Sequence, residues 1–464
     1  MIDGLRAYPE MKETGLPWLG HIPTHWEVRR NGRLFSARRE PGFPDLPILE
    51  VSIRSGVRVR DFANGARKQE MSDRSKYQRA VTGDIAYNMM RMWQGAVGVA
   101  PSDGLVSPAY VVARPFASIH APYYAYLFRT AAYMREVDTF SRGIVPDRNR
   151  LYWESFKQMS SAFPPLDEQR LIARFLDWHG SRTAKLVRAK KKIISLLNEQ
   201  KQAIIHRAVT RGLNSSVKLK PSGVPWLGDV PESWTIQSLG SMTKRRRLRN
   251  RGDLPLLSVV RERGVILRSS MSDEENRNFV PDDLSNYKVA LHGDLVINKM
   301  KAWQGSLGIA PCDGIVSPAY FVYQLDIEDV AFGQMLLRSK EYVASFARVS
   351  DGVRIGQWDL SIDGMKRIPV LRPPRDEQVA IVEFVNRSTL ELESIKQFTD
   401  REISLLQEFR VRLIADAATG NVDVRAAAAG LPDITEAPIN EPSGDGDIDD
   451  AFNADACESA ETAA

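Results

Sequence analysis

The chain has 464 residues, of which 43% are hydrophobic and 26% are charged, so it is globular and long enough for two or three domains with their own cores. No apolar run reaches the roughly twenty residues of a membrane span, and the first residues lack the pattern of a signal peptide, so we expect a soluble, cytoplasmic protein. Only two cysteines occur, which excludes a disulfide framework and a thiolate zinc cluster.

The net charge of +5 is unevenly distributed along the chain. Residues 425–464 contain ten Asp or Glu and one Arg, whereas residues 1–424 contain 62 Lys or Arg and 48 Asp or Glu. The acidic end is rich in Ala and Gly, which is typical of a disordered tail. The basic body favours a polyanionic partner, of which nucleic acid is the commonest. A solvated surface without a partner is the alternative.

The segment between Trp26 and Phe163 has mixed patterns. Residues 46–53, 84–90, 96–100 and 105–114 predict short strands, and residues 123–137 predict a helix. This part of the chain therefore predicts a domain of mixed α and β structure.

A long helix is predicted next. Pro164-Pro165 interrupts the chain before Asp167-Glu168-Gln169, which resembles a helix start with acidic residues in its first turn. From residue 167 to residue 211 there is no Pro and one Gly, and apolar residues recur with a spacing of three and four. Such a helix would be about 68 Å long, too long to be an ordinary core helix.

The sequence then repeats itself after about 209 residues. A repeat of this length is a whole domain with its connector, and it predicts two similar surfaces related by approximate symmetry. The matching segments are residues 15–20 (GLPWLG) and 223–228 (GVPWLG), Trp26 and Trp234, residues 93–110 and 303–320, which both contain Trp-Gln-Gly and Ser-Pro-Ala-Tyr, and Asp167-Glu168-Gln169 and Asp376-Glu377-Gln378.

A second long helix is predicted from Asp376 to the residues before Gly420. We expect the two helices to bury each other as an antiparallel pair, because the intervening domain can return the chain. The basic residues of the first helix (Lys185, Arg188 and residues 190–192) complement the acidic residues of the second (Glu391, Glu393 and Glu402).

The predicted fold class is α+β, of α/β type, with two similar domains joined by two long antiparallel coiled-coil helices in an internal pseudo-two-fold repeat. The predicted segments are a first domain (1–165), a first spacer helix (166–213), a second domain (214–374), a second spacer helix (375–424) and a disordered acidic tail (425–464).

This order of duplicated motifs resembles the DNA specificity subunit of type I restriction-modification systems. The resemblance covers nearly all of residues 15–422. It implies two target recognition domains that each read one half of an interrupted sequence in double-stranded DNA, with the long helices as a ruler between them. Pseudo-two-fold symmetry would place the reading elements about one helical turn apart, near 10 base pairs. The implied partners are two adenine methyltransferase subunits and restriction/translocase subunits.

The candidate DNA-binding residues are Arg and Lys in the stretches where the two copies diverge, with Arg142, Arg148 and Arg354 as further candidates in Gly-containing loops just before the long helices. Most such contacts go to phosphates rather than bases. The run from Lys244 to Arg251 has six basic residues in eight, dense enough for a phosphate clamp. The alternative is a solvated loop without a ligand. The candidates are Arg58, Arg60, Arg67, Lys68, Arg74, Lys76, Arg79, Arg142 and Arg148 in the first domain, and Lys244, Arg245, Arg246, Arg247, Arg249, Arg251, Arg261, Arg263, Arg268 and Arg354 in the second.

The repeated Asn-x-Met-x-x-Trp-Gln-Gly motif, which begins at Asn88 and at Asn298, could form a nucleic-acid platform. A structural role is favoured, because residues that are identical in two domains cannot explain different targets. Asp103 and Asp313 precede Gly and are interpreted as turn residues.

Motifs for catalysis are absent from the sequence. It contains no Gly-rich cofactor turn, no Asn-Pro-Pro-Tyr adenine-methylating motif, no phosphate-binding loop and no metal-ligand spacing of histidines. We therefore expect a non-catalytic chain without a cofactor, with S-adenosylmethionine, ATP and Mg²⁺ bound only by partner subunits. Two alternatives stay open: a self-contained methyltransferase or nuclease, and a duplicated coiled-coil scaffold for protein assembly without DNA specificity.

Overall fold

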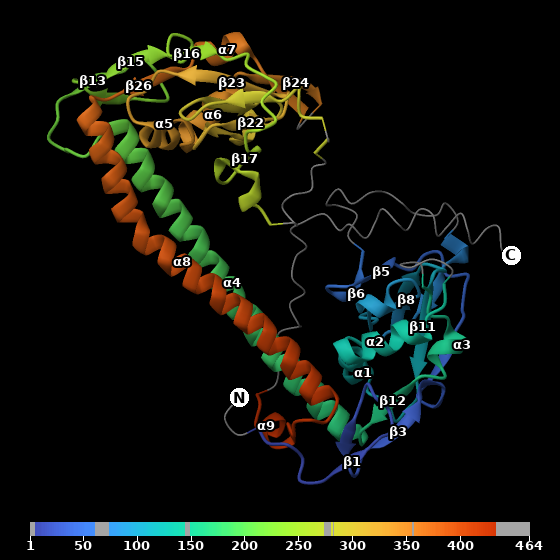
Figure 1. Ribbon diagram of the computed structural model, residues 1–464. Helices are drawn as coiled ribbons and strands as arrows, with labels where there is room; N and C mark the ends of the chain where they lie inside the picture. The colour runs from blue at the N-terminus through green and yellow to red at the C-terminus, as the bar shows by residue number, and fades with distance from the viewer. Residues whose placement is uncertain are drawn as a thin grey trace. The chain divides into compact units, whose positions relative to one another are not determined.

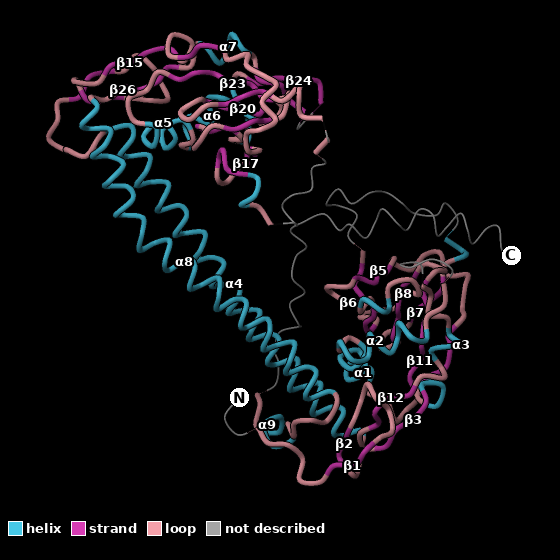
Figure 2. The backbone as a smooth tube through the Cα atoms, viewed as in Figure 1, coloured by secondary structure: helices cyan, strands magenta, loops and turns pink. Residues whose placement is uncertain are grey.

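The structure is a computed structural model that describes residues 5–60, 74–143, 149–272, 280–281, 283–354 and 357–432 (Figure 1). It divides into two compact units. The first unit comprises Met1–Lys190 and Arg401–Ala464, and the second comprises Lys191–Asp400. Each unit holds one of the two predicted domains and one end of each long helix. Figure 2 shows strands, helices and loops mixed within each domain, whereas the long helices are helical throughout.

The domain of the first unit is built on a four-stranded antiparallel sheet of order β4-β11-β8-β9. Two-stranded pairs complete it: β5 with β6, β7 with β10, β3 with β12 and β1 with β2. The bounds are β1 Met11–Glu13, β2 His21–Pro23, β3 Glu27–Arg30, β4 Phe35–Arg38, β5 Leu49–Ser52, β6 Gly56–Val59, β7 Gln78–Ala80, β8 Ile85–Asn88, β9 Val97–Val99, β10 Gly104–Val106, β11 Tyr110–Pro115 and β12 Ser160–Phe163, with single turns η1 Asn31–Arg33, η2 Arg74–Lys76 and η3 Met92–Gln94.

The central sheet separates two layers, because side chains alternate between its faces. Ile85 and Tyr87 of β8 lie in a large core with the helices, and Ala86 between them lies in a smaller core with the β5–β6 hairpin. The hairpin therefore covers the face opposite the helices.

Two sequence predictions for this domain need correction. The helix expected at residues 123–137 is two helices, α1 Ala121–Phe128 and α2 Ala131–Phe140. The break occurs at Thr130, whose hydroxyl accepts a hydrogen bond from Tyr133 N as an N-cap. The strand expected at residues 105–114 is likewise two strands, β10 and β11, separated by the Ser-Pro-Ala turn. A short helix, α3 Trp153–Phe156, precedes β12.

The domain of the second unit repeats this architecture. Its central sheet has the order β16-β23-β20-β21, which matches β4-β11-β8-β9 position by position. One further hairpin, β24–β25, follows α6. The bounds are β13 Leu219–Pro221, β14 Asp229–Pro231, β15 Thr235–Ser238, β16 Thr243–Arg245, β17 Leu257–Val260, β18 Gly264–Leu267, β19 Lys288–Ala290, β20 Leu295–Asn298, β21 Leu307–Ile309, β22 Gly314–Val316, β23 Tyr320–Leu325, β24 Ser350–Arg354, β25 Gln357–Leu360, β26 Pro369–Arg372, η4 Arg268–Ser270, η5 Ala302–Gln304, α5 Val330–Leu337, α6 Lys340–Arg348 and α7 Ile362–Lys366.

The two long helices are α4, Leu166–Arg211, and α8, Arg375–Ala418. Ion pairs join them: Lys190 Nζ lies 2.7 Å from Glu402 Oε2 in the first unit, and Lys201 Nζ lies 3.0 Å from Glu393 Oε2 in the second. Partners on α8 descend in number as those on α4 ascend, so the helices are antiparallel, as the sequence predicted. The complementarity of Lys190 and Glu402 is confirmed, whereas Glu393 pairs with Lys201, which the sequence analysis did not name.

The repeated Asp-Glu-Gln motif fixes each helix start to its own domain. Buried Gln169 accepts a hydrogen bond from His120 N and donates to the carbonyl of Pro164. Buried Gln378 accepts from Asp329 N and donates to the carbonyl of Pro373. These hydrogen bonds explain why the motif occurs twice.

The C-terminal end of α8 is part of the core of the first unit. Leu413, Ala417 and Ala418 are buried there, and Tyr123 donates a hydrogen bond to the carbonyl of Ala418. The chain remains ordered beyond the predicted boundary at residue 424, because Val424 and Ala428 of the short helix region α9 Arg425–Ala429 are also buried in this core. Residues 433–464 of the predicted tail lie outside the described residues.

Candidate nucleic-acid interface

The first candidate residues are Arg58 on strand β6 of the β5–β6 hairpin and Arg60 directly after it. Arg58 forms an ion pair with Glu50 on the neighbouring strand, and Arg60 Nε lies 4.0 Å from the same carboxylate. One acidic residue thus offsets part of the positive charge of this hairpin. Arg74 and Lys76 lie on η2, where Lys76 is exposed.

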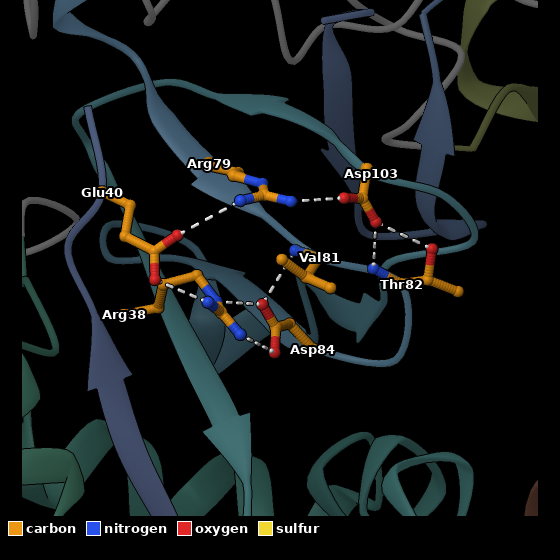
Figure 3. A network of polar contacts seen from close by, with 7 residues as sticks. All are labelled: Arg38, Glu40, Arg79, Val81, Thr82, Asp84 and Asp103. Atoms are coloured by element: carbon orange, nitrogen blue, oxygen red, sulfur yellow. Dashed lines mark hydrogen bonds and ion pairs between the residues drawn. The ribbon is translucent and has the colours of Figure 1, made fainter. Parts of the chain in front are cut away.

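Arg79 belongs to a network of ion pairs in the first domain (Figure 3). Its guanidinium lies 2.8 Å from Asp103 and 3.6 Å from Glu40. Glu40 also pairs with Arg38, which lies 2.6 Å from the buried carboxylate of Asp84. The hydrogen bonds from Arg79 and Thr82 lower the pKa of Asp103 to about 2. Arg79 is therefore held by two carboxylates. Asp103, which the sequence indicated as a turn residue, also forms an ion pair with Arg79 and accepts hydrogen bonds from Thr82.

Arg246 occupies the position of Arg38 in the second domain. It forms an ion pair with buried Asp294, which matches Asp84. Asp294 and Asp84 each also accept one main-chain hydrogen bond, from Leu291 N and Val81 N. Arg246 thus links β16 to the turn before β20, a role that its place in a basic run did not indicate.

The run from Lys244 to Arg251 does not form one continuous basic face. Arg245 and Arg246 lie on opposite faces of an extended strand, because successive side chains alternate. Lys244, Arg245, Arg247, Arg249 and Arg251 are exposed, but Arg251 pairs with Asp253 at 2.7 Å. The exposed cations therefore divide into two sets on different faces.

Arg261 and Arg263 lie at the exposed turn of the β17–β18 hairpin, and Arg268 begins η4 after it. The carbonyl of Arg261 accepts a hydrogen bond from Arg338 at 2.8 Å. Arg129 makes the matching contact in the first domain, where it donates to the carbonyls of Ile53 and Arg54. Burial lowers the pKa of both Arg129 and Arg338. Sequence analysis missed these two arginines, which recur about 209 residues apart and tie each hairpin turn to a helix end.

Two of the remaining candidates, Arg142 and Arg354, follow α2 and α6 in the chain. Arg142 is exposed and exchanges two main-chain hydrogen bonds with Arg150, at 3.0 and 2.9 Å. Arg354 ends strand β24, but its side chain lies outside the described part of the structure. Arg67, Lys68 and Arg148 also lie outside the described residues.

The repeated Trp-Gln-Gly motif forms the same turn in both domains. Asn88 Oδ1 accepts from Met90 N, and Trp93 Nε1 donates to the carbonyl of Met90. Asn298, Met300 and Trp303 form the same two bonds. The last Gly of the motif has a φ of 89° or 87°, a left-handed conformation that favours glycine. These bonds account for the motif structurally.

Two cations of the second domain lie close to the ring of Phe321 on β23. Arg245 lies 5.4 Å and Lys288 lies 6.0 Å from the centre of the Phe321 ring. Arg249 forms a β-bridge with Lys288, and Lys299 is also close enough to lower the pKa of Lys288. Lys288 and Lys299 were not among the sequence candidates, because Lys288 is a single basic residue in a short strand and Lys299 lies in the turn after β20, within the repeated motif to which a structural role was assigned.

Within the described residues, no group of His, Cys, Asp and Glu is arranged to hold a metal ion. The described helices also include none with the length and apolarity that a membrane span requires.

Comparisons with known proteins find similar chains, although no family model matches. The chain is 23% identical over 312 residues to the putative type I restriction enzyme MjaX specificity subunit of Methanocaldococcus jannaschii, covering 63% of this chain and 70% of that protein. It is 23% identical over 350 residues to the type I restriction enzyme EcoKI specificity subunit of Escherichia coli, covering 70% of each. It is 22% identical over 338 residues to the StySPI specificity subunit of Salmonella potsdam, covering 69% of each.

A solved chain from work on complex assembly and conformational transition of the type I R-M system has the same fold, with a TM-score of 0.60 and 14% identity. The match covers 86% of this chain and 99% of that one. Similarity in sequence and similarity in fold thus point to the same group of proteins that the duplicated motifs resemble.

Proposed function

We propose that this chain is the DNA specificity subunit of a type I restriction-modification system and reads a two-part, gapped target in double-stranded DNA. One observation carries the proposal most strongly. Two domains share the same strand order and the same internal ion pair (Arg38 with Asp84, Arg246 with Asp294). Other basic residues differ, since Arg79 of the first domain matches Val289 and Lys288 of the second matches Gln78. One scaffold with two different sets of outward cations suits two different half-sites. The specificity subunits to which the chain is similar favour the same function.

The chain is a non-catalytic subunit, as its similarity to specificity subunits indicates. Adenine methylation and restriction then belong to partner chains, which would bind S-adenosylmethionine, ATP and Mg²⁺. Action on genomic DNA implies a cytoplasmic location.

Exposed apolar side chains on the long helices are suited to docking two methyltransferase subunits. Leu186 and Ile395 occupy matched positions and are 45% and 41% exposed, and the matched Leu196 and Leu405 are 49% and 63% exposed. Large apolar side chains exposed at repeated positions on a helix are typical of protein interfaces. Their duplication suggests one methyltransferase per half of the chain, with restriction/translocase subunits joining the assembled core. The duplicated scaffold without DNA specificity is disfavoured by the chain's relatives.

The proposal is tested by mapping modified bases in the native host genome with the gene intact and with the gene deleted. The expected result is the loss of adenine methylation at one gapped, two-part motif, with all other motifs retained. Re-expression of the intact gene is the control and restores the motif. Loss of an ungapped motif would contradict recognition by two domains. If methylation does not change, binding of the purified chain to duplex DNA decides the matter, and absence of salt-dependent binding would refute the proposal.

A further inference from the structure

We propose that Arg245 and Lys288 beside Phe321, together with Arg249 next to Lys288, form a phosphate-binding site for duplex DNA that the second domain has and the first domain lacks. The inference rests on the proposed function and deepens it, because it assigns an unequal share of backbone binding to the two half-sites.

The geometry brings these cations together from two segments of the chain. Arg245 is on β16, Lys288 is the first residue of β19, and Arg249 is bridged to Lys288 through the main chain. Arg245 and Lys288 both approach the ring of Phe321, at 5.4 and 6.0 Å. The Nζ of Lys288 donates a hydrogen bond of 2.6 Å to the carbonyl of Tyr320, which fixes the ammonium beside that ring.

The group has an excess of positive charge. Among the described residues, Arg245, Arg249 and Lys288 form no ion pair with a carboxylate, and only Lys299 beside them does, with Asp359 at 2.9 Å. Burial, followed by the nearby charges of Arg245, Arg249 and Lys299, lowers the pKa of Lys288. Like charges held together in a partly desolvated place repel one another. An anion such as a DNA phosphate would relieve this repulsion and accept the free N–H groups.

The first domain has uncharged residues at every matched position. The strand registers show that Arg245 is equivalent to Ala37 and that Lys288 is equivalent to Gln78. Leu248 and Glu40 accept equivalent main-chain hydrogen bonds, so the next residues, Arg249 and Pro41, are also equivalent. Lys299 and Phe321 correspond to Met89 and Val111. The site is therefore specific to one domain, unlike the Arg246–Asp294 pair, which both domains share in equivalent form.

The test is the variant Lys288→Gln, which installs the residue that the first domain carries. We would measure binding of the full-length chain to a labelled 40-base-pair duplex of random sequence at several salt concentrations. The slope of log K against log salt is negative, and each lost phosphate contact makes it less steep by about 0.9. The variant should therefore lose about one unit of slope, and Lys288→Gln combined with Arg245→Gln should lose about two. The matched control is Lys218→Gln, which removes the same charge from an 81% exposed position of the second domain and should leave the slope unchanged.

An unchanged slope in Lys288→Gln, or an equal loss in Lys218→Gln, would overturn the inference and leave the proposed function standing. Absence of salt-dependent binding by the unaltered chain would contradict both this inference and the proposed function. Thermal unfolding checks the fold, and we expect no decrease in unfolding temperature because the variant relieves repulsion. Should Lys288→Gln destabilise the domain, Arg245→Gln alone carries the test, since Arg245 is exposed. Its expected result is again a loss of about one unit of slope.

Discussion

Asp84 and Asp294 each connect a turn of their domain to an arginine through one buried carboxylate. Each is buried, accepts a main-chain hydrogen bond from its own turn and binds an arginine at the end of the edge strand, β4 or β16, of the same sheet. A buried charge is tolerated only when it is paired and hydrogen-bonded. Arg38 and Arg246 are therefore required by the fold, and loss of either would leave an uncompensated carboxylate in the core.

Asp103 allows a prediction about acid stability. Its pKa in the folded chain is about 2, below the ordinary value near 4, so its interactions stabilise the fold fully above pH ~5 and are lost as the pH falls towards 2. We expect Asp103→Asn to be less stable than the unaltered chain at pH 6, and the difference in unfolding temperature to shrink between pH 5 and pH 2.5. Thermal unfolding followed by circular dichroism at each pH measures this.

The matched control is Asp313→Asn. Asp313 accepts the equivalent main-chain hydrogen bond, from His292 N at 2.8 Å, but has no arginine ion pair among the described residues. Its replacement should change the acid dependence less than Asp103→Asn does. Equal effects at the two positions would show that Arg79 does not stabilise the first domain through Asp103.

At the scale of residues, sequence reasoning located basic segments better than it identified the roles of single side chains. Density along the chain predicted a clamp at residues 244–251, but alternation in an extended strand places neighbours on opposite faces, and Arg246 forms an internal ion pair. Lys288 approaches Arg245 and Arg249 only through strand pairing. Neither fact follows from local composition, because both depend on contacts between residues far apart in the sequence.

At the scale of elements, the long helices were the most predictable part of the chain. Their sustained apolar spacing and proline-free length set them apart, and the structure has them at Leu166–Arg211 and Arg375–Ala418. The short elements were less predictable, because a single cap at Thr130 divides one apparent helix into two. Strands β3 and β12 were not predicted, since each is short and is ordered by pairing with the other.

The exposed leucines of these helices give a prediction about assembly. Leu196→Glu combined with Leu405→Glu would place a carboxylate in each of two matched apolar surfaces, at positions 49% and 63% exposed. Loss of an interface anchor costs about 2 kcal/mol or more, which is roughly a 30-fold weaker complex. If the chain docks an adenine methyltransferase as proposed, isothermal titration with that subunit should show the loss, while binding of the chain alone to duplex DNA changes little.

Asn198→Glu combined with Gln407→Glu is the control for this pair, because both residues are exposed on the same two helices and the changes add the same charge. It should leave methyltransferase affinity within about twofold of that of the unaltered chain. If the double variant binds the methyltransferase with full affinity, the docking surface lies elsewhere.

At the scale of the whole molecule, the first unit is made from both ends of the chain. Main-chain hydrogen bonding joins Asp423 to Arg6, and Arg425 lies 4.0 Å from the carboxylate of Glu168 at the start of α4. Buried Glu168 also pairs with His25 at 2.8 Å. Residues 423–425 are therefore structural parts of the first domain.

This arrangement predicts a sharp difference between two truncations. A chain that ends at Gly420 loses buried Val424 and Ala428 and the Asp423 and Arg425 contacts, and should lose at least about 2 kcal/mol of unfolding free energy from the first unit. A chain that ends at Pro432 loses only residues 433–464 and should unfold at the same temperature as the full chain. Differential scanning calorimetry of both chains measures the difference. Equal unfolding of the two would mean that residues 421–432 do not stabilise the first unit.

Because the first unit contains both the beginning and the end of the chain, it also determines the order in which the two units fold during synthesis on the ribosome. The second unit is one continuous segment, Lys191–Asp400. The core of the first unit includes Leu413, Ala417 and Val424, so it is incomplete until these residues have been synthesised. At about 5–20 residues per second, the roughly 210 residues in between take on the order of 10–40 s to translate. The domain that emerges first is therefore completed last, and its unfinished apolar surface must be protected from aggregation while the second domain is still being made.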